Sequence, residues 1–265
     1  MAFRRPGSEL PAPSSPGTPR PAMMVPMEPG PVPLRVGISA CLLGREVRYD
    51  GGHKRDRWLT DVLGARVEFV PVCPEVELGL GTPRPPIRLE EVRGGSVRLL
   101  EPSTGRDLTG RMAGFAARRV RELDAENLSG FVLKADSPSC GSDRVKVWNR
   151  RGPPRKAGVG VFAEVLLRCH PFLPVEEEGG LRDERTREEF LRRMTAYRRV
   201  RNLFRSRWRK GDLVRFLDGE EAALRTADPK APGKLRRLVA GRKGKPRRGM
   251  EEAFLGIYMG AFFRP

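Results

Sequence analysis

The sequence predicts an α/β fold, in which a doubly wound, mostly parallel sheet has helices on both faces and is followed by an all-helical C-terminal segment. Three observations support this prediction. Short apolar runs alternate with stretches of helical periodicity, which is typical of a parallel sheet. Three of the four cysteines come just after such a run. Beyond about residue 183, apolar residues recur at the three-and-four spacing of amphipathic helices.

The predicted strands are short apolar runs that end at polar, turn-rich segments. They cover residues 34–40, 67–72 and 130–134. We expect helices near residues 58–63, 112–123 and 158–167, and a hairpin over residues 88–100. In such a sheet, ligands bind beyond the carboxyl ends of the strands.

The last third of the chain is predicted to be a helical domain, residues 179–265, which follows the α/β domain of residues 34–178. Its first helix has arginines on the outer face. The apolar side of this helix is formed by Phe190, Met194, Tyr197, Val200 and Phe204. Further helices are expected over residues 212–224 and 250–262, with a basic loop at residues 241–249 between them.

Residues 1–33 contain ten of the 25 prolines and show no periodic apolar pattern. A segment of this composition cannot bury enough apolar surface to fold, so we predict that it is disordered. Met23, Met24 or Met27 is an alternative start of the chain. No function is assigned to this extension.

The net charge of +18 is concentrated near the C-terminus. Residues 34–180 carry 24 basic and 20 acidic side chains, a net charge of +4, whereas residues 181–265 carry 24 and 11, a net charge of +13. This asymmetry indicates a polyanionic partner, with RNA or DNA as the leading candidates. The alternative is that all proteins of the source organism are rich in arginine, so that the basic surface does not indicate a partner.

The sequence favours a cytoplasmic protein with no membrane association. No apolar run approaches the roughly 18 residues that span a bilayer, and no apolar stretch follows Arg4 and Arg5 as in a secretory signal. In a reducing compartment, cysteines serve as thiols or metal ligands rather than as disulfides.

Cys41, Cys73 and Cys140 each follow a predicted strand. Because the carboxyl ends of parallel strands meet at one edge of a sheet, we expect the three thiols to lie on one rim. The alternative is that they are buried as small apolar residues.

Thiolates suit zinc, copper(I) or iron–sulfur clusters. Structural zinc sites and ferredoxin-like clusters use closely spaced cysteines, which these are not. Three single thiolates can instead hold three irons of a 4Fe-4S cluster and leave the fourth iron open as a Lewis acid. An RNA-binding module with structural zinc on the cysteines remains the alternative.

The other cysteine and the two histidines are weaker candidates. Cys169 can complete a fourth ligand position, but we expect it to be packed at the end of an apolar helix face. His53 and His170 are too few for a histidine-rich metal site or a convincing catalytic triad.

Three polar residues near the cysteines are candidate catalytic residues. Glu75 lies two residues after Cys73 and can act as general base or acid, or it is an ordinary charge at a helix N-terminus. Ser137 and Ser139 can donate hydrogen bonds to a ligand carbonyl or a developing anion, or they simply cap a helix. The loops at residues 47–52 and 82–85 supply orienting contacts, or plain turns.

Over roughly residues 35–170 the chain resembles the thiouracil desulfidase family. The strings that carry the resemblance are residues 39–44 (SACLLG), 47–51 (VRYDG), 73–76 (CPEV), 83–85 (PRP) and, after Lys134, 137–141 (SPSCG). It implies a 4Fe-4S cluster on Cys41, Cys73 and Cys140, with the open iron taking the sulfur of a thiolated pyrimidine. Glu75 would be the acid or base, and Ser137 or Ser139 would assist at the pyrimidine.

The helical segment from Phe190 to Phe263 resembles a partner domain that is fused to this one in tRNA 4-thiouridine desulfidases. Single-domain relatives act on free 2-thiouracil. The resemblance therefore implies a non-redox conversion of 4-thiouridine in tRNA to uridine and hydrosulfide, with free 2-thiouracil as the alternative substrate. The chain ends at Pro265, before the usual end of the partner domain, and we interpret this segment as truncated. No oligomeric state is predicted.

Overall fold

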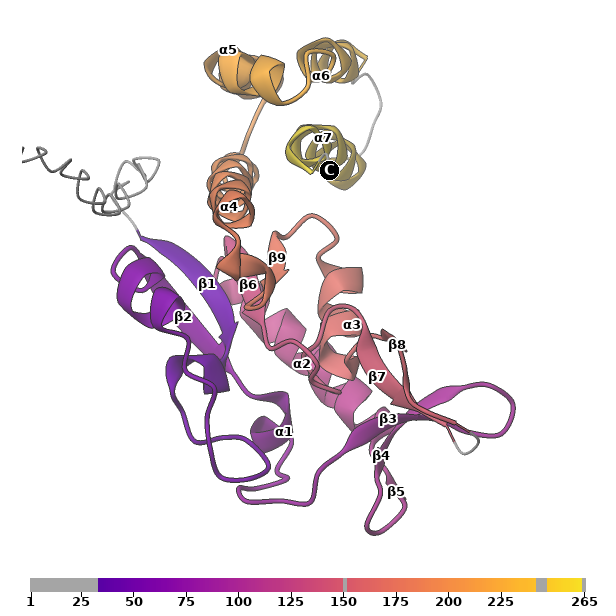
Figure 1. Cartoon of the computed structure of the whole chain (residues 1–265). Coiled ribbons are helices and arrows are strands. Elements are labelled where there is room, and N and C mark those ends of the chain that lie inside the picture. The colour runs from indigo at the N-terminus through magenta and orange to yellow at the C-terminus, as the bar shows by residue number, and fades with distance from the viewer. Residues whose placement is uncertain (1–32, 150–151, 242–246, 264–265) are drawn as a thin grey trace, which may run out of the picture.

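A computed structural model describes residues 33–149, 152–241 and 247–263. All but the last residue of the predicted disordered extension, residues 1–33, lies outside the described residues. The chain forms two sheets and a group of helices at the C-terminal end (Figure 1).

The first sheet is parallel and has the strand order β2-β1-β6-β9. Its strands are β1 (Leu34–Ser39), β2 (Val67–Val72), β6 (Gly130–Leu133) and β9 (Val175–Glu177). The first three confirm the predicted strands, whereas β9 is too short for its sequence to signal it. From β1 the chain passes to β2 on one side, and β6 lies on the other side. The carboxyl end of β1 is therefore the point at which ligands bind in doubly wound sheets.

Helices cover both faces of this sheet, as predicted. On one face lie α2 (Thr109–Ala125) and α3 (Val161–Cys169), which pack against Phe131 and Leu133 of β6. On the other face, the π-helical turn of Trp58–Leu63 and the start of α4 (Glu184–Arg205) pack against Val132 and Ile38. Residue 37 must be glycine, because a Cβ atom there would lie 2.3 Å from the Phe131 ring.

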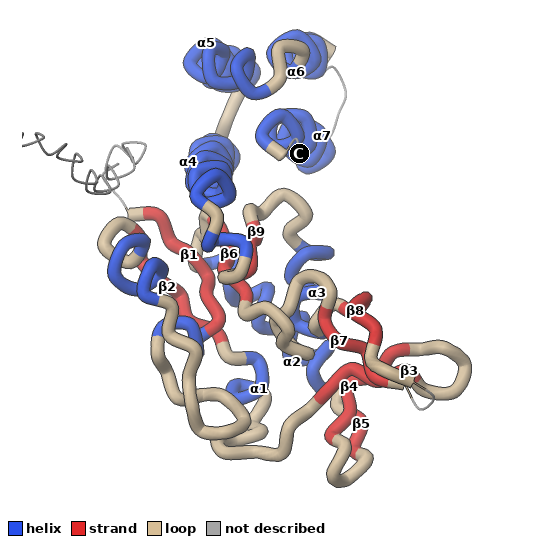
Figure 2. The backbone as a smooth tube through the Cα atoms, in the orientation of Figure 1, coloured by secondary structure: helices blue, strands red, loops and turns tan. Residues whose placement is uncertain are grey.

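The second sheet has five strands in the order β5-β4-β3-β7-β8 (Figure 2). These strands are β3 (Arg88–Glu91), β4 (Val97–Glu101), β5 (Arg106–Asp107), β7 (Val145–Trp148) and β8 (Arg155–Gly158). The predicted hairpin is its β3–β4 pair, but β5, β7 and β8 were not predicted. The helix expected from residue 158 begins only at Val161, because Gly158 ends β8.

The C-terminal segment folds into helices that pack on one another beside α4 (Figure 1). They are α5 (Lys210–Ala227), α6 (Ala231–Ala240) and α7 (Arg247–Phe262). The sequence did not predict α6, because Pro232 and Gly233 resemble helix breakers; proline is tolerated in the first turn of a helix. The prediction of a loop over residues 241–249 is wrong at its end, because α7 begins at Arg247. Residues 242–246 of this predicted loop lie outside the described part of the chain.

The α4 helix joins the two parts of the chain. Phe190 and Met194 near its start are fully buried against the parallel sheet, and Val200 further along is buried as well. The predicted boundary at residue 179 remains a prediction. Among the described helices, none has the length and apolar character needed to cross a bilayer.

Candidate functional site at the edge of the parallel sheet

The three cysteines that follow strands line one cavity of about 530 Å³. Cys41 lies in the 3₁₀ turn of Ala40–Leu43 after β1, and Cys73 lies between β2 and the short helix α1 (Pro74–Glu77). Cys140 lies in the turn after β6. The strand ends thus bring together residues that are 32 and 67 positions apart in the sequence.

The three thiols are protonated at neutral pH unless a cation binds them. Burial raises the pKa of Cys41 to about 11 and raises the pKa of Cys73 and Cys140 as well. The neighbouring thiols oppose each other's ionisation, whereas Lys134 and Arg48 favour the thiolate of Cys41. Metal binding requires thiolates and supplies the positive charge that stabilises them.

The donor set fits a cluster better than a single ion. Within the part of the chain that the structure describes, no three His, Cys, Asp or Glu side chains form a group that can hold one metal ion. A structural zinc site takes four ligands, usually in closely spaced pairs, whereas this cavity brings together three single cysteines. Thiolates that hold a cluster bind different irons and lie further apart.

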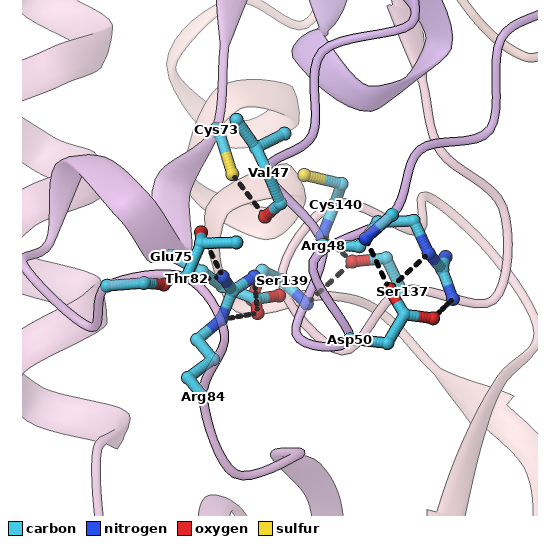
Figure 3. Close-up of polar contacts among 12 residues, drawn as sticks. Val47, Arg48, Asp50, Cys73, Glu75, Thr82, Arg84, Ser137, Ser139 and Cys140 are labelled. Carbon is cyan, nitrogen blue, oxygen red and sulfur yellow. Dashed lines mark hydrogen bonds and ion pairs between the residues drawn. The ribbon is translucent and has the colours of Figure 1, made fainter.

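Glu75 lies on the wall of the same cavity and is held from two sides (Figure 3). Arg84 donates to its Oε2 atom from Nε at 2.9 Å and from Nη2 at 2.6 Å. Ser139 donates to its Oε1 atom at 2.9 Å. The Arg84 side chain also donates from Nη1 to the Gly81 carbonyl at 2.8 Å. Both oxygens of the Glu75 carboxylate therefore accept hydrogen bonds from the protein.

The two predicted serines occupy different positions. Ser139 is fully buried behind Glu75. Ser137 lines the cavity, and its Oγ atom accepts hydrogen bonds from the backbone N–H groups of Ser139 at 3.3 Å and Cys140 at 3.0 Å. Ser137 therefore caps the turn that carries Cys140, and not a helix. Its own hydroxyl proton has no acceptor among the described residues. That proton is available to a ligand.

Ser39, Lys134 and Glu178 were not predicted as functional residues, whereas Arg84 belongs to the loop at residues 82–85 that was expected to supply orienting contacts. Arg84 holds Glu75, and the buried hydroxyl of Ser39 favours the thiolate of Cys140 and accepts from the Lys134 N–H at 3.0 Å. Lys134 in turn forms an ion pair with Glu178. Ser39 and Arg84 lie in the strings at residues 39–44 and 83–85, and Lys134 precedes the string at residues 137–141, but the sequence does not show which partners these side chains contact.

The remaining sequence candidates lie outside the cavity. Cys169 is exposed at the last residue of α3, so the expectation that it is packed is wrong: a helix end leaves the side chain in solvent. The Nε2 atom of His170 lies 3.5 Å from the Oδ1 atom of Asp124. The Nδ1 atom of His53 accepts a hydrogen bond from the backbone N–H of Arg55.

The fold and the site together define a class of α/β protein that carries a thiol-lined cavity and an arginine-held carboxylate at the switch point of a parallel sheet. The family model described as 2-thiouracil desulfurase matches residues 36–178, and the chain belongs to this family. Residues 179–265 lie outside the matched range.

One curated relative is the uncharacterized protein YbbK of Bacillus subtilis (strain 168). It is 34% identical over 137 residues, which cover 50% of this chain and 89% of the relative. A solved structure, described as the [4Fe-4S]-dependent thiouracil desulfidase TudS, is 37% identical with a TM-score of 0.45. The match covers 56% of this chain and 93% of that one.

Proposed function

We propose that this chain is a 4Fe-4S-dependent desulfidase that removes sulfur from a thiolated pyrimidine. The observation that carries the proposal is the meeting of Cys41, Cys73, Cys140 and Glu75 on one cavity wall. Family membership supports the reaction class. We assign the cluster to the three cysteines.

The reaction is a hydrolysis without electron transfer. When bound, the cluster supplies an iron that lacks a protein ligand and acts as a Lewis acid toward a soft sulfur atom. Water adds its oxygen to the ring carbon, the C–S bond breaks, and the sulfur leaves as hydrosulfide. The protons of the water go to Glu75 and to the leaving sulfur.

In this proposal, the residues around the cavity have separate roles. The Oε1 atom of Glu75 accepts one hydrogen bond, from Ser139, and keeps a lone pair for the proton of the attacking water. Arg84 fixes the other carboxylate oxygen, so the carboxyl group cannot rotate freely. Ser137 donates a hydrogen bond from its hydroxyl group to the pyrimidine.

We infer that the substrate is 4-thiouridine in tRNA, which gives uridine as the product. Support comes from the net charge of +13 over residues 181–265. Four exposed cations, Arg205, Arg207, Arg209 and Lys210, also gather where α4 meets α5. Such a patch suits a phosphate backbone. The family description favours a second candidate, free 2-thiouracil.

The cluster is tested by iron and sulfide analysis of protein purified without oxygen. We expect each of Cys41→Ser, Cys73→Ser and Cys140→Ser to lose the bound iron, the brown colour and the activity. Cys169→Ser is the matched control and should retain all three, because Cys169 lies outside the cavity. An active, colourless variant of any of the three would refute the assignment. Zinc without iron or sulfide would support the RNA-binding module.

The substrate is tested by competing thiolated tRNA against free 2-thiouracil in one assay. Replacing Arg205, Arg207, Arg209 and Lys210 together by Gln should weaken tRNA binding, reduce its salt dependence and leave turnover of 2-thiouracil intact. Replacing Arg111 and Arg121 on α2, which are also exposed, is the control. Equal tRNA turnover by the quadruple variant at all salt concentrations would favour the free base.

A further inference from the structure

We propose that the side chain of Tyr49 is the surface on which the pyrimidine ring of the substrate stacks at the mouth of the cavity. The inference rests on the proposed function and adds a binding residue for planar bases to it. It concerns the geometry of the loop at residues 47–52, which comes between Cys41 and Cys73 in the sequence.

The position of Tyr49 is unusual for an aromatic side chain. It is 43% exposed, and it lines the same cavity as the three cysteines and Glu75. Among the described residues, only a few large apolar side chains are this exposed, and the others, Val97, Trp148, Val214 and Phe263, do not line this cavity. An exposed ring that lines a cavity has an apolar face to offer a ligand.

The loop that carries Tyr49 is held by its own hydrogen bonds. The Arg48 N–H donates to the Gly52 carbonyl at 3.2 Å, and the Gly51 N–H donates to the Arg48 carbonyl at 3.0 Å. The Asp50 carboxylate accepts from the Gly52 N–H at 3.0 Å. A ring on a braced loop loses little conformational freedom when a ligand binds, which favours binding.

The same loop is tied to the residue that holds Glu75. The Arg84 N–H donates to the Tyr49 carbonyl at 2.9 Å, while the Arg84 side chain binds Glu75. The Cys73 thiol donates to the Val47 carbonyl at 3.7 Å. The stacking surface and the carboxylate therefore keep a fixed relation to each other, whereas the bond from Cys73 to Val47 exists only while the thiol is protonated.

One face of the Tyr49 ring is already occupied. The Arg48 guanidinium lies over it, 5.4 Å from the ring centroid, and is itself paired with Asp50. The proposal assigns the opposite face to the planar ligand. Base–aromatic stacking is strong and accepts any base, because every base has a π-face.

The hydroxyl of Tyr49 has no hydrogen-bond partner within the described ranges. The proposal assigns the binding to the ring face alone, so Tyr49→Phe should behave like the wild type. Tyr49→Leu removes the π-surface but keeps an apolar side chain of similar reach. Both variants should fold, because the side chain is exposed and outside the hydrophobic core.

Trp148 provides the matched control. It is 36% exposed, and the Arg88 guanidinium lies 4.8 Å from its ring centroid, but it belongs to the second sheet and does not line the cavity. Trp148→Leu therefore removes an exposed ring with a stacked arginine from a place where no base is expected.

The experiment uses the full chain loaded with iron and sulfide. It measures the binding of reaction products, which are not turned over, and the kinetics of the substrates. Dissociation constants of uracil and of uridine are measured by equilibrium dialysis, and KM and kcat for 2-thiouracil and for thiolated tRNA are measured in parallel. We expect Tyr49→Leu to weaken product binding and to raise KM by about fivefold or more. Iron content and kcat should change little.

Equal dissociation constants for wild type and Tyr49→Leu would overturn the proposal. So would an equal loss in Trp148→Leu, or the absence of measurable binding to the wild type. If the wild type binds uracil or uridine through Tyr49 but desulfurates neither substrate, the stacking surface stands and the proposed reaction falls. If desulfidation proceeds and Tyr49→Leu is indistinguishable from the wild type, only the stacking surface falls.

Discussion

The Nε and Nη2 atoms of Arg84 both donate to a single carboxylate oxygen of Glu75, and this pair is almost completely removed from water. The Arg84 side chain is 4% exposed and the Glu75 side chain 13%. The pair leaves the other carboxylate oxygen to Ser139 and to the cavity.

Replacing Glu75 by Gln should reduce kcat by about 10²–10⁴-fold while iron is retained, because the residue is proposed to accept a proton and not to bind metal. Steady-state kinetics and iron analysis of the same preparation check this. Glu90→Gln is the control: Glu90 accepts the same two-donor contact from Arg88, but it lies on the second sheet. Full activity in Glu75→Gln would rule out its role.

Removing the arginine should act on both stability and rate. Arg84→Met leaves the Glu75 carboxylate without its charge partner and should lower the free energy of unfolding by about 3 kcal/mol. Arg84→Lys keeps the positive charge but cannot donate two hydrogen bonds to one carboxylate oxygen. Compared with Arg84→Met, it should therefore recover more of the stability than of kcat. Urea unfolding and kinetics separate the two effects. A parallel recovery of both would show that Arg84 is structural only.

Gly160 controls the position of the Cys140 turn. A Cβ atom at residue 160 would lie 2.5 Å from the Ser139 carbonyl carbon and 2.8 Å from the Cys140 nitrogen. Gly160→Ala must therefore displace that backbone, with a loss of about 1–3 kcal/mol and a lower iron content. Gly114→Ala, in α2, meets no atom within 4 Å and should be neutral or slightly stabilising. Normal iron loading of Gly160→Ala would contradict the expectation.

In the helical segment, the Tyr258 hydroxyl donates to Glu220 at 2.7 Å, and Arg199 pairs with the same carboxylate. Burial raises the pKa of Tyr258, so it stays a donor at any pH the protein tolerates. Tyr258→Phe removes a bond to a buried carboxylate and should cost about 1–3 kcal/mol in urea unfolding. Tyr197→Phe is the control, since Tyr197 is also a buried residue but no described residue pairs with its hydroxyl. A smaller loss at Tyr258 than at Tyr197 would show that the bond adds nothing.

His170 makes stability depend on pH. Burial lowers its pKa below the ordinary value of about 6.5, Arg201 lowers it further, and Asp124 opposes the shift. The folded protein therefore binds fewer protons here than the unfolded chain, and stability falls as the pH drops below about 6.5. Relative to His170→Gln, the wild type should lose stability between about pH 7 and 5, measured by urea unfolding at both values. A constant difference would contradict the shift.

The sequence by itself determined the class of fold and the convergence of the three thiols. Each of three strands is followed directly by a cysteine or by a turn that contains one, and helices separate the strands. Because parallel strands share a direction, these cysteines lie at one edge of the sheet. The apolar spacing also predicted α4, α5 and α7, since helical periodicity is a local property.

Only the tertiary structure decided how the site is completed. Arg84 and Glu75 are nine residues apart, and no periodicity links a loop residue to a carboxylate on a separate helix. The different positions of Ser137 and Ser139, the second sheet around β7 and the exposure of Cys169 depend on contacts between distant segments. Local patterns set where strands and helices form, whereas the partners of polar side chains are chosen by packing.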